Sequence, residues 1–180
     1  FMPVQSSVLV TRPLTDEELT NAGWTSDQMA FDSRNLLHYF RLMPSSQFLF
    51  GMRGGIFANA RSDAKIKGLI RSDFEQMFPA WRHVETPHMW SGLVCMNAKG
   101  APFTGPIPDM PGAFASLSYH GNGVAMASYC GTLLADLVQD KDTRLPYPEV
   151  LKSTPSKLPF GTKRRWVLPP IYAAMGLVDR

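Results

Sequence analysis

The chain has 180 residues, of which 44% are hydrophobic and 18% charged, so it is long enough for one ordinary domain with a real core. This composition excludes a disordered chain, a collagen and a coiled coil. Gly, Pro or charged residues break every apolar stretch before the roughly 20 residues that a membrane span needs, so no membrane span is predicted.

The first residues, FMPV, have neither the basic start nor the apolar run of a signal peptide, and we expect the chain to be a fragment. The two cysteines, Cys95 and Cys130, show no C-x-x-C spacing, which argues for neither a disulfide framework nor a zinc site. Both are expected to be small buried apolar residues. A reducing, cytoplasmic location is the default expectation.

The net charge of +3 comes entirely from the C-terminal segment. Residues 1–140 carry ten Lys and Arg against twelve Asp and Glu, whereas residues 141–180 carry eight against three. A basic excess can indicate that a protein binds nucleic acid. The run Lys163–Arg165, however, lacks the interleaved aromatic residues of a protein that binds single-stranded nucleic acid. We therefore predict no nucleic-acid partner. Residues 141–180 are interpreted as a basic, proline-rich extended tail that ends in a short apolar helix, Ile171–Val178.

The chain opens with a strand that feeds a short helix. The short run Gln5–Thr11, which contains several β-branched residues, predicts the strand. Pro13 followed by Thr15–Glu18 predicts a turn and an N-capped helix start. Aromatic-rich runs on either side of Pro44-Ser45-Ser46 then predict a β-hairpin over 36–53.

The second strand of this hairpin has two different faces. Phe48, Phe50 and Met52 alternate onto one face, which leaves Arg53 on the other face at the strand end. Arg53 is a candidate to clamp a substrate carboxylate bidentately, and a solvated strand-end arginine is the alternative. His38, in the first strand, is interpreted as a core or interface histidine.

A helix is predicted over 62–78, where Ser62 can cap it and apolar residues recur at three-to-four spacing until Pro79 ends it. Residues Trp90–Cys95 predict another strand. Residues Ala101–Pro111 hold four prolines and a glycine, and we interpret them as a rigid loop without any regular element.

The sharpest local pattern is a strand over Ala113–Tyr119, the turn His120–Gly123 and a helix over Val124–Val138. One stripe of apolar and small residues runs along this helix: Val124, Ala127, Gly131, Leu134, Ala135 and Val138.

A glycine turn before a helix has a definite chemistry. The helix N-terminus offers unpaired N–H groups and the positive end of the dipole, and glycine lets a ligand approach the backbone. The turn can bind a nucleotide phosphate or the electron-rich edge of a reduced flavin, while a tight turn that binds nothing is the alternative. His120 beside it is a candidate functional residue. The histidines show no metal-ligand spacing, so no metal is predicted.

A series of short segments follows one order through the chain: Val8–Leu14, Tyr39–Leu42, Leu49–Gly51, Phe78-Pro79, Trp90–Gly92, Met96-Asn97, Pro102, Gly105, Gly121–Val124, Gly131, Leu134-Ala135, Pro159–Gly161, Arg164-Arg165, Met175–Leu177 and Asp179-Arg180. In this order they resemble the C-terminal half of the FAD-dependent amine oxidoreductases that are similar to D-amino-acid oxidase, and the gamma-glutamylputrescine oxidase type above all.

The resemblance implies an α+β fold with parts of two domains. Residues 1–90 would belong to the antiparallel sheet of a substrate-binding domain with packed helices. Residues 91–140 would be the C-terminal strand, turn and helix of an FAD-binding domain, followed by the tail 141–180. The family's dinucleotide-binding G-x-G-x-x-G follows no predicted strand in this sequence, so the resemblance implies an incomplete fragment.

The resemblance also implies a function, oxidation of the C–N bond of a small amine or amino acid by hydride transfer to FAD, with the fragment alone inactive. Arg53 and His120 would border the substrate pocket. The implied cofactor-binding residues are Asn97, Tyr119, Gly121, Asn122, Gly123 and Val124.

Many relatives carry Ser-Gly-His-Gly-Val where this chain has His120–Val124, so the histidine has moved and the backbone role of the turn is better supported than a side-chain role. The alternative function is a non-enzymatic module that binds an anionic partner through residues 141–180. Without the rest of the FAD domain, residues 91–140 would expose apolar edges, and the fragment is expected to self-associate.

Overall fold

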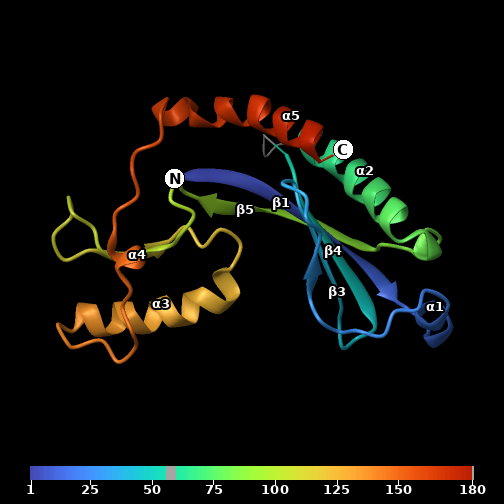
Figure 1. Ribbon diagram of the computed structural model, residues 1–180, viewed down its shortest axis with the longest axis horizontal. Coiled ribbons are helices and arrows are strands. Elements are labelled where there is room, and N and C mark those ends of the chain that lie inside the picture. The colour runs from blue at the N-terminus through green and yellow to red at the C-terminus, as the bar shows by residue number, and fades with distance from the viewer. Residues whose placement is uncertain (56–59, 180) are drawn as a thin grey trace. The chain divides into compact units, whose positions relative to one another are not determined.

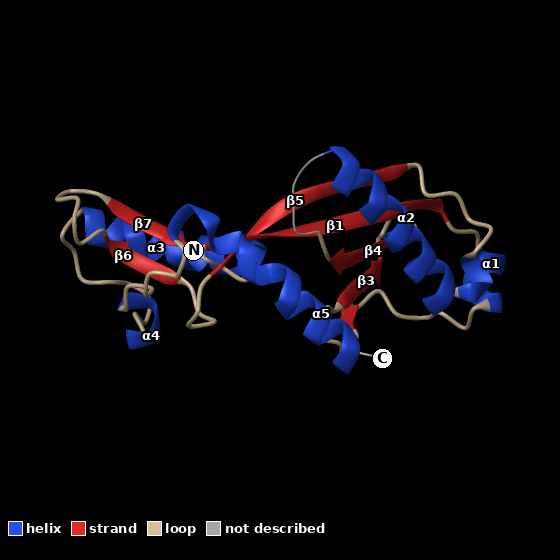
Figure 2. Cartoon of the chain, turned by 90° about the horizontal axis from the view of Figure 1, so that it is seen from above, coloured by secondary structure: helices blue, strands red, loops and turns tan. Residues whose placement is uncertain are grey.

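The computed structural model describes residues 1–55 and 60–179, and the chain forms two compact units. The sheet unit comprises Val4–Leu93 with Val167–Arg180, and the α3 unit comprises Phe1–Pro3 with Val94–Trp166. Each unit is described by itself. Figure 1 traces the chain from its N-terminus to its C-terminus, and Figure 2 shows the same helices and strands from a second direction.

The sheet unit is built on a five-stranded sheet with the order β2-β3-β4-β1-β5. β3 and β4 form the antiparallel hairpin that the sequence predicts over 36–53, and β1 pairs antiparallel with the other edge of β4. The predicted first strand and the strand over 90–95 are also confirmed. The strands are β1 (Met2–Pro13), β2 (Ala30–Phe31), β3 (His38–Leu42), β4 (Gln47–Arg53) and β5 (His88–Met96).

One face of this sheet carries the main core. Phe48 and Phe50 of β4 are fully buried on it, as the alternation of the strand predicts. Helix α2 (Ala60–Met77) packs against these rings through Ile70 and Phe74, which are also fully buried. The expectation of an α+β fold with an antiparallel sheet and packed helices is therefore confirmed.

The turn after α2 closes the core. The helix predicted over 62–78 is confirmed, but Ser62 lies inside it and does not cap it, because α2 already includes Ala60. Pro79 ends the helix by starting the short helix η1 (Pro79–Trp81). Trp81 is buried, and its indole N–H donates to the Glu18 carbonyl at 3.1 Å. The core thus connects α2 to the first helix of the chain.

Helix α1 (Asp16–Asn21) starts where the sequence predicts and is held by one carboxylate. Thr15 Oγ1 accepts from the Glu18 N–H at 3.2 Å, and the Glu18 carboxylate accepts from the Thr15 N–H at 2.9 Å. Arg12 donates to both Glu18 carboxylate oxygens, at 2.7 and 2.9 Å, and His83 lies 2.9 Å away. The Arg12 guanidinium holds the pKa of Glu18 well below its usual range.

His38 at the start of β3 is a core histidine, as predicted, with 3% of its surface exposed. Its Nδ1 lies 2.7 Å from Asp32 Oδ2 and its Nε2 lies 3.1 Å from Asp73 Oδ2 of α2, while its ring stacks on Phe50. Burial by itself lowers the pKa of His38, but the hydrogen bonds to Asp73 and Asp32 outweigh burial and raise that pKa. The ring therefore ties the loop before β3 to α2.

The C-terminal helix α5 (Leu168–Val178) contains the predicted apolar helix 171–178 and is fastened to the same loop. The Asp179 carboxylate accepts from the Asn35 N–H and Nδ2 at 2.8 Å each and from the Leu36 N–H at 2.9 Å. The backbone hydrogen bonds from Leu36 and Asn35 lower the pKa of Asp179. The loop before β3 is thus held from two sides.

The α3 unit combines a small antiparallel sheet with helices. Its elements are β6 (Phe103–Pro106), β7 (Phe114–Leu117), α3 (Gly123–Val138), α4 (Glu149–Lys152) and η2 (Gly161–Val167). The strand and helix predicted around the glycine turn are confirmed. The core of the unit consists of Cys130, Leu133 and Leu151, which also confirms that Cys130 is buried.

The prediction that residues 101–111 contain no regular element is wrong, because β6 lies within them. Pro106 occupies the last position of β6 in a two-stranded sheet, where a missing N–H is tolerated. Gly105 has a φ of +153°, and a Cβ there would come 2.8 Å from the Tyr147 hydroxyl. The glycine and the prolines therefore shape this strand and do not prevent it.

The prediction of an extended tail is also wrong in part, because α4 and η2 interrupt it. Pro148, with φ −62° and ψ 145°, is the N-cap residue of α4, and α5 carries a proline in its first turn. Proline fits these positions because the first N–H groups of a helix need no intrahelical acceptor. Several prolines of the tail therefore mark helix starts.

Helix α3 buries a different face from the stripe that stands out in the sequence. Val124 and Val138 of the stripe are 98% and 60% exposed, whereas Cys130, Leu133 and Asp136 are buried. The stripe is the solvent-exposed side of the helix. Across the described residues, no helix is long and apolar enough to cross a membrane.

Candidate functional site

The turn between β7 and α3, residues 118–123, is called the glycine turn here. Three of its residues have a positive φ: Ser118 at 64°, His120 at 55° and Gly121 at 103°. Only glycine adopts such angles freely, so the position of Gly121 requires glycine. Ser118 and His120 need support from neighbouring groups.

Helix α3 starts from this turn without a capping side chain. Asn122 is the N-cap residue, but its side chain makes no cap hydrogen bond among the described residues. The first N–H groups of the helix, at Gly123 and Val124, have no intrahelical acceptor. Gly121 and Val124 are exposed and Gly123 is half-buried, so the positive end of the helix dipole lies at a surface that an anionic or electron-rich ligand can reach.

The structure brings together two of the predicted site residues, Asn97 and His120. Nε2 of His120 lies 3.3 Å from the Asn97 backbone nitrogen and 3.3 Å from Asn97 Oδ1. Asn97 is fixed in turn, because its Nδ2 donates to the Ala101 carbonyl at 2.7 Å and its Oδ1 accepts from the N–H groups of Lys99 and Gly100. The Asn97 side chain is therefore committed to protein contacts.

Tyr119, another predicted site residue, connects the turn to β7 and β6. Its hydroxyl donates to Ser116 Oγ at 2.8 Å, and Ser116 Oγ lies 2.8 Å from Thr104 Oγ on β6. A Cβ at Gly123 would pack against the Tyr119 ring at 3.6 Å. The side chains around the glycine turn thus hold it in place, and the Asn122 N–H donates to the Tyr119 carbonyl at 2.9 Å within it.

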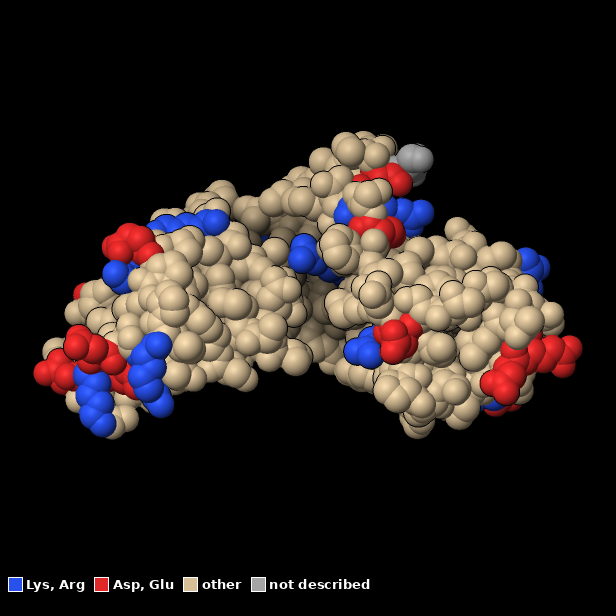
Figure 3. All heavy atoms as spheres, turned by 60° about the horizontal axis from the view of Figure 1, so that its bottom comes forward, with Lys and Arg blue, Asp and Glu red and all other residues tan. Residues whose placement is uncertain are grey.

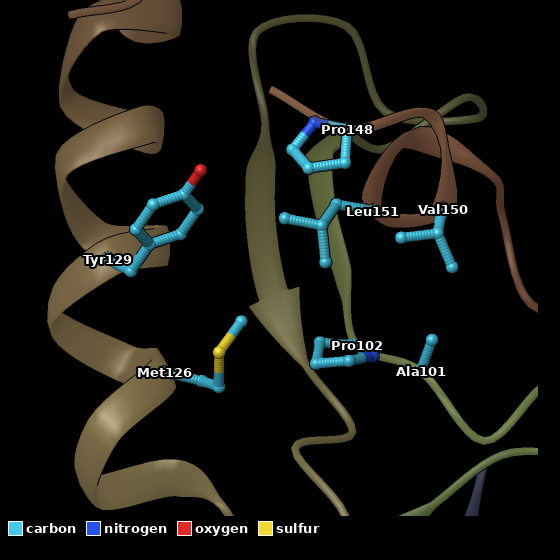
Figure 4. Close-up of a pocket in the computed structure, with 7 residues that line it drawn as sticks. All are labelled: Ala101, Pro102, Met126, Tyr129, Pro148, Val150 and Leu151. Carbon is cyan, nitrogen blue, oxygen red and sulfur yellow. The ribbon is translucent and has the colours of Figure 1, made fainter. Parts of the chain in front are cut away.

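An apolar groove of about 330 Å³ lies in the same unit, and sequence analysis missed it. Figure 4 shows Met126 and Tyr129 projecting from α3 toward α4 and the segment before β6. The Tyr129 hydroxyl donates to the Pro146 carbonyl. The lining residues come from three separate segments, which no local pattern connects: Ala101, Pro102, Met126, Tyr129, Pro148, Val150 and Leu151.

Arg53, the predicted substrate-pocket residue, lies in the sheet unit at the end of β4. It is half-buried on the face opposite the Phe50 core, as the strand alternation predicts. Its register partner on β1 is Ser6, and its N–H donates to the Leu37 carbonyl at 3.2 Å. Among the described residues its guanidinium makes no ion pair, so it remains available to an anion.

Two hydroxyl groups accompany Arg53 on this face. The Tyr39 hydroxyl lies 3.0 Å from Ser6 Oγ, so the tyrosine reaches across β4 from β3 to β1. Gly51 makes this possible, because a Cβ there would overlap the Tyr39 ring. The strand alternation places Tyr39 and Arg53 on one face, a signal that sequence analysis could have used.

Acidic and basic side chains are interspersed on the face of the molecule drawn in Figure 3, and most of that surface is uncharged. Within the parts of the chain that the structure describes, no group of three or more His, Cys, Asp or Glu is arranged to hold a metal ion.

Several known proteins have similar structures. Iminodiacetate oxidase from Chelativorans sp. BNC1 superposes with a TM-score of 0.62 at 13% identity, over 87% of this chain and 41% of that protein. Glycine oxidase from Geobacillus kaustophilus superposes with a TM-score of 0.62 at 19% identity, over 86% of this chain and 40% of that protein. At these identities the superpositions show a shared fold.

Sequence comparison is more specific. The probable oxidoreductase OrdL of Rhizobium meliloti (strain 1021) is 34% identical over 168 residues, which cover 93% of this chain and 37% of that protein. The chain thus spans little more than a third of the length of this curated relative. The family model described as FAD dependent oxidoreductase matches residues 1–137. The chain therefore belongs to the family of FAD-dependent oxidoreductases that includes the D-amino-acid oxidases.

Proposed function

We propose that the protein oxidises the C–N bond of a small amine or amino acid, with FAD as the acceptor of the hydride. The observation that carries this proposal is the uncapped start of α3 behind the glycine turn, in a chain of an FAD-dependent family. In this class the cofactor supplies the redox chemistry, and the protein binds and orients the reactants. The family match does not favour the alternative of a non-enzymatic module with a basic binding tail.

The glycine turn is the proposed contact to the flavin. The N–H groups of Gly121, Gly123 and Val124 can donate hydrogen bonds to an electron-rich ring edge, and the dipole of the 16-residue helix α3 favours negative charge there. Tyr119 and Asn122 shape the turn, and Asn97 supports it from the end of β5. These residues fit the group because the side chains hold the turn and leave its backbone open.

Arg53 is the proposed binder of a substrate carboxylate. A guanidinium can hold a carboxylate by two parallel hydrogen bonds, and the Tyr39 and Ser6 hydroxyls on the same face can accept and donate further bonds. The named oxidases with this fold, for glycine and iminodiacetate, support a substrate that carries both an amine and a carboxylate. By this proposal residues 1–90 are part of a substrate-binding domain and residues 91–140 part of an FAD-binding domain.

The proposal is tested with purified protein that contains the whole open reading frame. We expect a flavin absorption band and its bleaching when an amino acid or polyamine is added without oxygen. Arg53→Met should raise KM for substrates with a carboxylate at least tenfold and leave KM for simple amines unchanged. A protein without a flavin band, which no amine or amino acid bleaches, would refute the proposal.

For the 180-residue chain by itself we propose self-association and no catalytic activity. The stripe on α3, with Val124 and Val138 exposed, offers an apolar surface to a second copy. Light scattering should show dimers or larger species, and Val124→Lys should shift the distribution toward monomers. A monomer at every concentration would contradict this proposal.

A further inference from the structure

The glycine turn is held by the segment at the end of β5 through two side-chain contacts. Cys95 Sγ lies 3.2 Å from Ser118 Oγ, and His120 Nε2 lies 3.3 Å from two atoms of Asn97. The two contacts are spaced alike in both segments: Cys95 and Asn97 are two residues apart in one, and Ser118 and His120 are two residues apart in the other. These contacts hold Ser118 and His120. Within the glycine turn, Ser118 and His120 are the residues that have a positive φ without being glycine.

Such backbone angles persist only where the surroundings fix them. His120 can be fixed by Asn97 in either tautomer, because Nε2 accepts from the Asn97 N–H when it carries no proton and donates to Asn97 Oδ1 when it does. Asn97 is a well-fixed partner, because its side chain donates to the Ala101 carbonyl and accepts from the Gly100 N–H within the turn 97–101. The contact therefore joins two constrained turns.

We propose that His120 is a positioning residue, which sets the direction of the N–H groups of Gly121, Gly123 and Val124 through its contact with Asn97. This inference rests on the proposed function, because the direction of these groups matters for catalysis only if they face the flavin. Since Asn97 occupies Nε2, His120 acts through the backbone of the turn and does not transfer a proton at that nitrogen. The histidine beside the turn thus has a different role from a pocket residue.

Amide hydrogen exchange tests the contact without any cofactor. His120→Ala removes both polar ring atoms, and exchange in the peptide 119–126 should become about tenfold faster. His120→Gln offers a carbonyl and an NH₂ group to the same partner and should stay within about threefold of wild type. Asn97→Ala should match His120→Ala, and the double variant should exchange no faster than either single variant.

The matched control is His88→Ala, because His88 is an exposed histidine of β5. It should leave exchange in this peptide unchanged. The proposal is overturned if His120→Ala exchanges within twofold of wild type. It is equally overturned if His120→Gln exchanges as fast as His120→Ala, since the turn would then depend on the imidazole ring and not on hydrogen bonds to Asn97.

The reduction potential of the bound flavin tests the consequence for the proposed site. In the FAD-loaded protein, His120→Ala should lower the two-electron reduction potential of the flavin by about 30 mV, which corresponds to a tenfold change in the equilibrium constant for its reduction. His120→Gln should restore the wild-type potential. Faster exchange with an unchanged potential would overturn the positioning role. A protein that shows the exchange pattern but binds no FAD would refute the proposed function and leave the contact between His120 and Asn97 established.

Discussion

Replacing His38 by alanine removes a side chain that joins the loop before β3 to helix α2. The imidazole contacts Asp32 at 2.7 Å and Asp73 at 3.1 Å and stacks on Phe50 with 5.2 Å between ring centroids. The variant loses both hydrogen bonds and leaves a cavity against the core. The Asp32 and Asp73 carboxylates each lose the imidazole as a hydrogen-bond partner.

The expected loss of stability follows from these contacts. A hydrogen bond to a charged group contributes about 1.5–3 kcal/mol in mutational series. Asp32 and Asp73 keep 18% and 29% of their side-chain surface in water, so each carboxylate recovers part of this energy by solvation. With the lost packing against Phe50 included, we expect His38→Ala to lower the free energy of unfolding by about 3 kcal/mol.

The loss should depend on pH in one direction. The pKa of His38 in the folded protein is raised above its unfolded value, which is about 6.5 for histidine. The folded state therefore binds the proton more tightly, and the stabilisation by His38 is complete below the unfolded pKa. The part that comes from proton binding disappears as the pH rises through the folded pKa, whereas the packing on Phe50 remains, so the stability difference between wild type and variant should become smaller in alkaline solution.

Urea denaturation of both proteins at about pH 5.5 and about pH 9 measures this dependence. The difference in unfolding free energy between wild type and His38→Ala should be larger at the lower pH. His83→Ala is the matched control, because His83 is 59% exposed and its ion pair with Glu18 should contribute at most about 1 kcal/mol. Equal differences at both pH values, or a larger one at pH 9, would refute the reasoning.

Three further changes test other parts of the sheet unit. Glu18→Gln should lower the unfolding free energy by about 2 kcal/mol in urea at neutral pH. Because folding lowers the pKa of Glu18, this difference should begin to shrink as the pH falls below about 4, near the unfolded pKa of glutamate, and should be lost only as the pH falls through the lower folded pKa. Gly51→Ala should lower thermal stability by about 1–3 kcal/mol, because the new Cβ displaces the Tyr39 ring. Asp179→Ala should speed amide exchange at residues 35–36 about fivefold, and unchanged exchange there would contradict the role of this carboxylate.

The sequence predicts those elements of the fold that have a strong local pattern. The hairpin is predictable because aromatic residues alternate on both sides of Pro44-Ser45-Ser46, and α1 because Thr15 and Glu18 form a capping box. Strand β2 has only two residues and exists through its pairing with β3, so no local pattern announces it. Strand β6 is obscured by prolines that a two-stranded sheet tolerates.

The candidate site shows the same division between local and distant information. The glycine turn stands out in the sequence because strand, glycines and helix follow one another directly. The contact between Asn97 and His120 joins residues 23 positions apart, and the one between Ser6 and Tyr39 joins residues 33 positions apart. Each residue can be suspected from its type and place, but only the folded chain shows which pairs meet.

Helix α3 shows why periodicity alone does not identify a buried face. The stripe from Val124 to Val138 is the most regular apolar pattern of the helix, yet the unit's own core forms around Cys130 and Leu133 on another side. A helix with apolar residues on two sides is typical of one packed between two layers. β6, β7 and α4 supply one layer within the unit, and we expect a second layer to cover the exposed stripe.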